Sequence, residues 1–159
     1  MRCKFLKFGV DSDLDEAISL QRSALVALDL CPTGHSDRSD SLHNLAVYFS
    51  DRFNIQGAIS DLEEAVTLGR AALELCSPGH SGRASTLNNL AYYMRRKFLK
   101  FGANGDLDEA ISLYRSALDL RPAGHSDRLR SLDQLAYCLS SRFERVAAEA
   151  DLNELISLR

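Results

Sequence analysis

The sequence has no long apolar run, and this is evidence against a helical membrane protein. None of its apolar stretches approaches the ~20 residues that a membrane-spanning helix needs. The first nine residues, MRCKFLKFG, hold apolar pairs divided by lysines, so we expect no secretory signal there. The net charge is −3, which provides no overall basic field for nucleic acid. We therefore expect neither a membrane nor a nucleic acid as partner.

Cysteines are few and widely separated. The chain has four, none close enough to another to form a CxxC pair or a zinc-ligand spacing: Cys3, Cys31, Cys76 and Cys138. We expect free thiols in a reducing, cytoplasmic compartment. The chain also lacks a nucleophile–base signature, a glycine-rich phosphate loop and a dinucleotide fingerprint. These absences predict a protein that is not an enzyme and has no cofactor.

What the sequence does contain is a strict internal repeat. The motif Asp-Leu-x-Glu begins at Asp13, Asp61, Asp106 and Asp151, with spacings of 48, 45 and 45 residues. A Gly-His pair recurs at His35, His80 and His125, each 45 residues after the last. Such a period indicates an array of similar structural units.

Each repeat unit is predicted to form a pair of helices. In the segment DLDEAISLYRSALDL, Asp106 and Glu109 have the spacing of a capping box, and Pro122 and Gly124 follow its end. Ser36, Ser81 and Ser126, which follow the Gly-His pairs, are candidate N-caps of the other helix. That helix carries an apolar stripe at helical spacing, in the central copy Leu87, Leu90, Ala91, Met94 and Phe98. A hairpin of this kind buries its apolar face only by stacking on other copies.

The repeat resembles the tetratricopeptide (TPR) repeat. The resemblance lies in the Leu-x-x-Leu-Ala stripe, a glycine-containing turn, and Asp-Glu-Ala followed by Ala-Leu-x-Leu-x-Pro, matched by Ala91, Ala110, Tyr114, Ala117 and Pro122. Its 45-residue period is longer than the usual 34. That longer form is similar to kinesin light chain repeats and to fungal TPR arrays that are often joined to a caspase-like CHAT domain. The resemblance implies an all-α solenoid of about seven helices, stacked as antiparallel pairs in a right-handed superhelix.

The repeat boundaries predict a single array with incomplete ends. Residues 1–34 form a partial unit, 35–78 and 79–122 whole repeats, and 123–159 a second partial unit. Residues 1–9 match only the end of a first helix, and a second helix is expected from Asp13 to Leu30.

The polar motifs have structural explanations that compete with chemical ones. The paired carboxylates of Asp-Leu-x-Glu suit helix capping better than catalysis, because they lie in a helix's first turn. One histidine per repeat forms a ladder, whereas zinc ligands must converge on one point, so a loop or capping role is favoured and no metal is expected. Basic residues near Arg95 and Lys100 suit either an acidic partner or a solvated face.

By the same resemblance, the first helices line a concave groove. The positions beside the apolar stripes are Asp40, His43, Asn44 and Val47 in the first copy, Ser85, Asn88, Asn89, Tyr92 and Arg95 in the second, and Arg130, Asp133, Gln134 and Tyr137 in the third. Amides bond a peptide backbone, tyrosines offer apolar area, and arginine offers a fork for a carboxylate. The competing interpretation is that these residues are only the exposed half of amphipathic helices.

Three functions remain open from the sequence. We expect a protein–protein interaction scaffold that binds a peptide or protein segment. The alternatives are an accessory segment of a larger CHAT-type protease and a purely structural spacer. The ends suggest head-to-tail self-association, because each carries apolar residues that a neighbouring repeat would cover. At the start these are Leu14, Ile18, Leu25 and Leu28, covered in part by Phe5, Leu6 and Phe8. At the end they are Leu135, Leu139 and Phe143, with only the short helix of Leu152, Leu155, Ile156 and Leu158 beside them.

Overall fold

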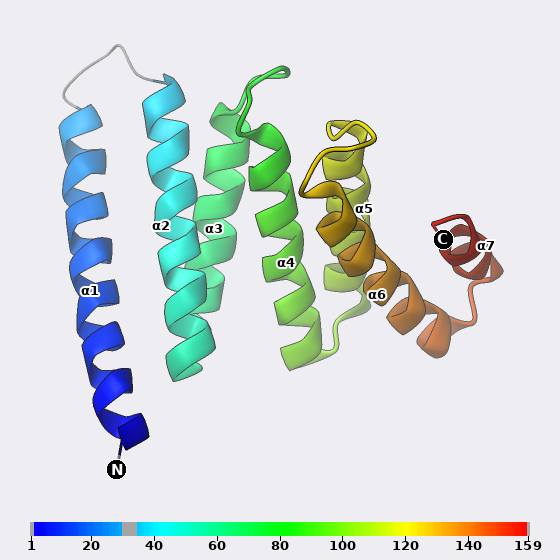
Figure 1. The fold of residues 1–159 in the computed structure, drawn as a ribbon, viewed down its shortest axis with the longest axis horizontal. Helices are drawn as coiled ribbons and strands as arrows, with labels where there is room; N and C mark the ends of the chain where they lie inside the picture. The colour runs from blue at the N-terminus through cyan, green and yellow to red at the C-terminus, as the bar shows by residue number, and fades with distance from the viewer. Residues whose placement is uncertain (1, 30–34, 159) are drawn as a thin grey trace. The chain divides into compact units, whose positions relative to one another are not determined.

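The computed structural model describes residues 2–29 and 35–158, and within these ranges it contains helices and turns but no strand. The helices described are α1 (Arg2–Asp29), α2 (His35–Gln56), α3 (Ile59–Leu75), α4 (Arg83–Phe101), α5 (Asn104–Asp119), α6 (Arg128–Val146) and α7 (Glu149–Ser157). The chain forms two compact units, Met1–Gly82 and Arg83–Arg159, described here as the N-terminal and C-terminal units. Within each unit, consecutive helices run antiparallel (Figure 1), which confirms the predicted all-α fold of helix pairs.

In the N-terminal unit, α2 packs against both α1 and α3. The predicted stripe of α2 is buried throughout: Leu42, Leu45, Ala46, Phe49 and Phe53. The Cys76 thiol is free and buried, with its Sγ 2.8 Å from the hydroxyl oxygen of Ser39. Cys138 is likewise free and buried, as expected, whereas the side chains of Cys3 and Cys31 lie outside the part that the structure describes.

In the C-terminal unit, α5 packs against both α4 and α6, and α6 packs in turn against α7. The predicted stripe of α4 is fully buried, with Ala91 inaccessible to solvent. Tyr114 of α5 is also inaccessible. The stripe of α6 is only partly buried: Leu135 and Leu139 are covered, but Leu132, Ala136 and Phe143 remain half-exposed.

The N-terminal helix differs from the sequence-based expectation. We expected a separate helix end at residues 1–9 and a second helix from Asp13, but α1 is one continuous helix that includes Gly9. At the equivalent positions, Gly57 and Gly102 adopt φ of 75° and 73° and turn the chain. Glycine permits both conformations, so its presence alone does not decide between a turn and a helix.

The turn that ends each first helix is the same in all three described copies. The backbone N–H groups of Gly57, Gly102 and Ala147 donate to the carbonyl oxygens four residues earlier, at 2.8, 2.7 and 2.8 Å. Ala147 adopts the left-handed conformation with φ of 49°, where the other two copies have glycine. This αL cap satisfies a carbonyl at the end of the helix and reverses the chain direction.

The prediction that the repeated aspartates are N-caps is wrong. The cap residues are Ala58, Ala103 and Ala148, which have no side-chain capping bond, and the helices begin two residues before each aspartate. Asp13 lies inside α1. The aspartates instead accept from the basic residue nine positions earlier, across the hairpin: Arg52 to Asp61, Lys97 to Asp106 and Arg142 to Asp151.

The arginine versions of this pair each join three helices. Arg52 on α2 binds Asp61 on α3 through Nε at 2.9 Å and Asp15 on α1 through Nη1 at 2.7 Å. Arg142 on α6 repeats the arrangement with Asp151 on α7 at 2.8 Å and Asp108 on α5 at 2.7 Å. A fork with several donors suits this bridging better than a point charge.

The repeated histidines, not the serines, complete the loops. The ring Nδ1 of His80 accepts from the backbone N–H of Gly82 at 3.1 Å, and that of His125 accepts from Asp127 at the same distance. The predicted loop role of these two histidines is therefore confirmed, whereas the predicted caps are wrong. Ser81 and Ser126 precede the starts of α4 and α6, and Ser36 lies inside α2.

Candidate functional site

The predicted groove residues fall on three helices in two units. Those of α2 belong to the N-terminal unit, and those of α4 and α6 belong to the C-terminal unit. On α2, Asp40 and Asn44 are exposed, and His43 and Val47 are half-buried. Burial lowers the pKa of His43, and the nearby Asp40 only partly opposes this change. The His43 ring is therefore neutral at pH 7, and the predicted groove residues of this helix carry no fixed positive charge.

The C-terminal unit brings three of the predicted residues together around a cation. The Arg95 guanidinium carbon lies 4.8 Å from the ring centre of Tyr137 on α6 and 5.6 Å from that of Tyr92 on its own helix. Tyr92 also packs edge-to-face on Tyr93, with ring centres 6.1 Å apart. Cation–π contacts of this kind fix a guanidinium in place without neutralising its charge.

Arg95 has a buried polar neighbour on α5. Arg95 Nε and the Tyr114 hydroxyl are both buried and close enough to interact, although neither forms a well-aligned hydrogen bond. Gln134 Oε1 on α6 is also buried and has no hydrogen-bond partner among the described residues. Burial raises the pKa of Tyr114, and the Arg95 charge only partly offsets that rise. Burial likewise raises the pKa of the Cys138 thiol to about 11. Both groups are neutral at pH 7, so neither provides a counter-charge for Arg95.

Asn88 has a different environment from its predicted neighbours. It is buried, and its Oδ1 accepts from the Ser131 hydroxyl at 2.8 Å and from Arg121 Nη1 at 3.5 Å. Arg121 is itself 4% exposed, and desolvation lowers its pKa. Sequence reasoning did not single out Arg121. The available signal was a charged residue at the position that Cys76 occupies in the preceding repeat.

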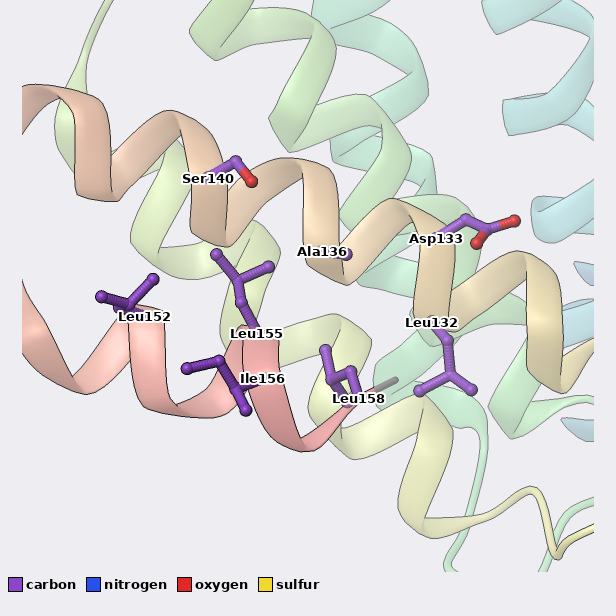
Figure 2. Close-up of a pocket in the computed structure, with 8 residues that line it drawn as sticks. All are labelled: Leu132, Asp133, Ala136, Ser140, Leu152, Leu155, Ile156 and Leu158. Carbon is purple, nitrogen blue, oxygen red and sulfur yellow. The ribbon is translucent and has the colours of Figure 1, made fainter.

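The remaining predicted residues of the C-terminal unit differ in exposure. On α4, Ser85 and Asn89 are half-buried. On α6, Arg130 and Asp133 are exposed and Gln134 is half-buried. Asp133 also borders a cleft of about 590 Å³ between α6 and α7, shown in Figure 2. The other residues lining this cleft are Leu132, Ala136, Ser140, Leu152, Leu155, Ile156 and Leu158.

The two apolar ends predicted from the sequence differ in which of their side chains are exposed. At the C-terminal end, Leu135 and Leu139 are 1% and 0% exposed, so their predicted exposure is wrong, whereas Leu152 and Ile156 of the short helix beside them are 43% and 63% exposed. On α1, Ile18 is only 5% exposed, so its predicted exposure is wrong, because α2 packs over this part of α1. Among the α1 side chains that the structure describes, Leu20 and Val26 are large apolar residues that are exposed. The side chains of Phe5, Leu6, Phe8 and Leu28 lie outside the described part.

Two further properties of the described residues bear on the kind of site. Among the described residues, no three His, Cys, Asp or Glu side chains are grouped so that they could hold a metal ion. None of the described helices combines the length and the hydropathy that crossing a bilayer requires.

Comparison with known proteins gives the family. A family model of the tetratricopeptide repeat matches residues 38–81 and 83–127. No curated protein matches the sequence significantly. Among solved structures, the chain is similar to a crystal structure of nearly identical TPR-like repeats described as putative kinesin light chain from Podosopora anserina. The identity is 19%, with 96% of this chain and 91% of that chain covered and a TM-score of 0.34. A single-substitution variant of that protein matches at 20% identity, with the same coverage and TM-score. Because the family model matches more than half of the sequence, the chain belongs to the tetratricopeptide repeat family.

Proposed function

We propose that this protein is a non-catalytic interaction module that binds an acidic peptide or protein segment on the face formed by α4 and α6. Tetratricopeptide repeats are in general protein-interaction scaffolds, which supports the class of function. The observation that carries the proposal is Arg95, held between Tyr92 and Tyr137.

The chemistry of this cluster favours an anionic group. Arg95 is half-buried, and no carboxylate among the described residues forms an ion pair with it. A partly desolvated guanidinium gains most from a carboxylate that meets its fork with two hydrogen bonds. Tyr137, which is 45% exposed, offers apolar area to the residues that flank that acid.

The test is peptide selection followed by substitution. A phage-displayed library of random peptides is selected on the full chain, and the enriched sequences are expected to contain Asp or Glu. Substituting Arg95→Gln should weaken a selected peptide by about tenfold or more, because a charge-assisted bidentate contact is lost. Tyr137→Leu should weaken it less, because most of its apolar area is retained.

Lys100→Gln is the matched control. Lys100 lies on the same helix and is exposed, so the substitution removes an equal charge away from the cluster. Affinity should change by less than about twofold in this variant. Equal peptide affinity for the wild type and Arg95→Gln would contradict the proposed function.

A further inference from the structure

The Tyr114 hydroxyl on α5 is a buried polar group that the packing of the fold does not explain. Tyr114 is inaccessible to solvent, and its hydroxyl forms no well-aligned hydrogen bond with the described residues. Most buried polar groups in folded proteins have such a bond, so an exception calls for an explanation. A phenylalanine would fill the same space without the cost of desolvating a hydroxyl.

The neighbour of this hydroxyl is the cation of the proposed binding site. Arg95 Nε is also buried without a well-aligned partner, and the two groups are close enough to interact. Burial raises the pKa of Tyr114, so the hydroxyl keeps its proton at pH 7. Its oxygen can therefore accept a hydrogen bond from Arg95 Nε without neutralising the guanidinium charge.

The preceding hairpin shows that the repeat can pack without this tyrosine. In α3, Gly69 is buried at the position that Tyr114 occupies 45 residues later. In α2, Ser50 is buried at the position of Arg95. The hairpin of α4 and α5 has both the phenol and the cation, and the hairpin of α2 and α3 has neither. This pairing favours a joint role for the two side chains.

The geometry of Arg95 limits which of its donors a ligand can reach. The rings of Tyr92 and Tyr137 lie 5.6 and 4.8 Å from its guanidinium carbon, and its Nε is buried. The side chain as a whole is half-buried, so the terminal Nη groups are the donors left for a ligand. Two such donors match the two oxygens of a carboxylate, whereas a neutral amide offers only one acceptor oxygen.

We propose that Tyr114 is a positioning residue of this site. Its hydroxyl accepts from Arg95 Nε and aims the terminal Nη groups at a carboxylate, so that the site selects an acidic side chain over the corresponding amide. The hydrogen bond becomes well aligned when the bound carboxylate fixes the guanidinium. This inference rests on the proposed function, because Tyr114 acts only through Arg95 and does not touch the ligand itself.

The test compares two fluorescein-labelled peptides, titrated with the full chain by fluorescence anisotropy. One is the tightest binder selected from the random library on the wild type, and the other has Asn or Gln in place of its Asp or Glu. Tyr114→Phe removes one oxygen atom and keeps the ring. It should weaken the acidic peptide by about three- to tenfold and leave the amide peptide within about twofold. In the Arg95→Gln background, Tyr114→Phe should have no further effect.

Thermal unfolding supplies a second measurement. The midpoint of Tyr114→Phe should equal or exceed that of the wild type, because the hydroxyl that is removed has no well-aligned partner in the free chain. The matched control is Tyr48→Phe, in which a half-buried tyrosine of the N-terminal unit loses the same atom. Affinity for the acidic peptide should stay within about twofold in this control.

The outcomes separate this inference from the proposed function. If Arg95→Gln weakens the acidic peptide but Tyr114→Phe leaves its affinity within about twofold, the positioning role is overturned and the proposed function stands. Equal weakening of both peptides, or an unfolding midpoint well below that of the wild type, would assign the hydroxyl to the structure instead. An unchanged affinity in Arg95→Gln would overturn the proposed function and the positioning role together.

Discussion

The central hairpin, α4 with α5, and the terminal hairpin, α6 with α7, are two copies of the same repeat, but their helices are packed differently. Leu107 and Leu152 are equivalent, yet their exposed fractions are 0% and 43%. Ile111 and Ile156 differ in the same way, at 1% and 63%. The residue types are identical, so the difference comes from packing: α5 packs against both α4 and α6, whereas α7 packs only against α6 among the described helices. The apolar pattern thus identifies a face suited to burial, and the neighbouring helix decides whether that face is buried.

The two hairpins also differ in the ion pair that closes them. In the central hairpin, Lys97 meets Asp106 at 3.4 Å through a single contact. In the terminal hairpin, Arg142 binds both oxygens of the buried Asp151 and also reaches Asp108. The terminal hairpin, with the shorter second helix, therefore has the stronger electrostatic connection.

The largest expected effect comes from breaking that connection. Asp151→Ala should destabilise the C-terminal unit by about 3 kcal/mol, because it leaves Arg142 without its buried partner. Asp106→Ala should cost only about 1 kcal/mol, because Lys97 can turn towards solvent. Chemical denaturation measures both values, and amide hydrogen exchange in α7 distinguishes local release from global unfolding.

Asp108→Ala serves as the control for this pair. Asp108 is 56% exposed, so its loss should cost less than about 1 kcal/mol. Equal destabilisation by Asp151→Ala and Asp106→Ala would show that the arginine bridge adds nothing over the lysine contact.

The same buried carboxylate predicts a pH dependence. The hydrogen bonds from Arg142 lower the pKa of Asp151 in the folded protein below its ordinary value. Its contribution to stability is complete above the unfolded pKa of about 3.9 and is lost as the pH falls below that value towards the folded pKa. The difference in thermal midpoint between wild type and Asp151→Ala should therefore narrow below about pH 4. A difference that stays constant from pH 6 to the acid limit would contradict this assignment.

The next largest difference between the two hairpins is expected where their helices cross, because the alanine at this position is buried in one hairpin and lines a cleft in the other. Ala91 is inaccessible, so Ala91→Leu should cost about 2 kcal/mol through overpacking. Its equivalent Ala136 lines the open cleft, so Ala136→Leu should change the stability by less than about 0.5 kcal/mol. The unfolding midpoints of the two variants, compared with that of the wild type, measure these changes in stability. An unchanged midpoint in Ala91→Leu would be incompatible with its burial.

At the turns we expect two smaller changes in stability, of opposite sign. Ala147 has φ of 49°, where an alanine is strained, so Ala147→Gly should stabilise the protein by about 0.5 kcal/mol. Gly102 has φ of 73°, and an added Cβ would meet only the end of the Arg145 side chain at 3.9 Å, so Gly102→Ala should cost about 1 kcal/mol from backbone strain alone. Thermal unfolding of both variants should show shifts of opposite sign, and shifts of the same sign would refute the equivalence of the two turns.

The smallest expected effect is a gain in the stability of the central hairpin. Lys97→Arg should stabilise it by about 0.5 kcal/mol, because a guanidinium can meet both oxygens of Asp106. The gain should disappear in the Asp106→Ala background, which a double-mutant cycle measures. Persistence of the gain in that background would place its origin elsewhere than in the ion pair.

Much of the fold was predictable because it depends on local pattern. The helix pairs, the buried stripe of α4 and the loop role of His80 follow from spacing and residue type. The candidate site was predictable only in part. Tyr92, Arg95 and Tyr137 were identified by helical position, but the same rule also selected Asn88, which Arg121 and Ser131 engage inside the unit.

The sequence by itself determined the repeat and the family, since both depend on residues close together in the chain. The tertiary structure alone decided which partners the polar side chains meet. Asp151 is an ion-pair acceptor and not a helix cap because the hairpin brings Arg142 across to it. Arg95 is a fixed cation because α6 places Tyr137 on its guanidinium. Ile156 is exposed, unlike Ile111, because no helix of the described chain packs on α7 as α6 packs on α5. Contacts of this kind form between helices, whereas a repeat pattern in the sequence describes only the residues along each helix.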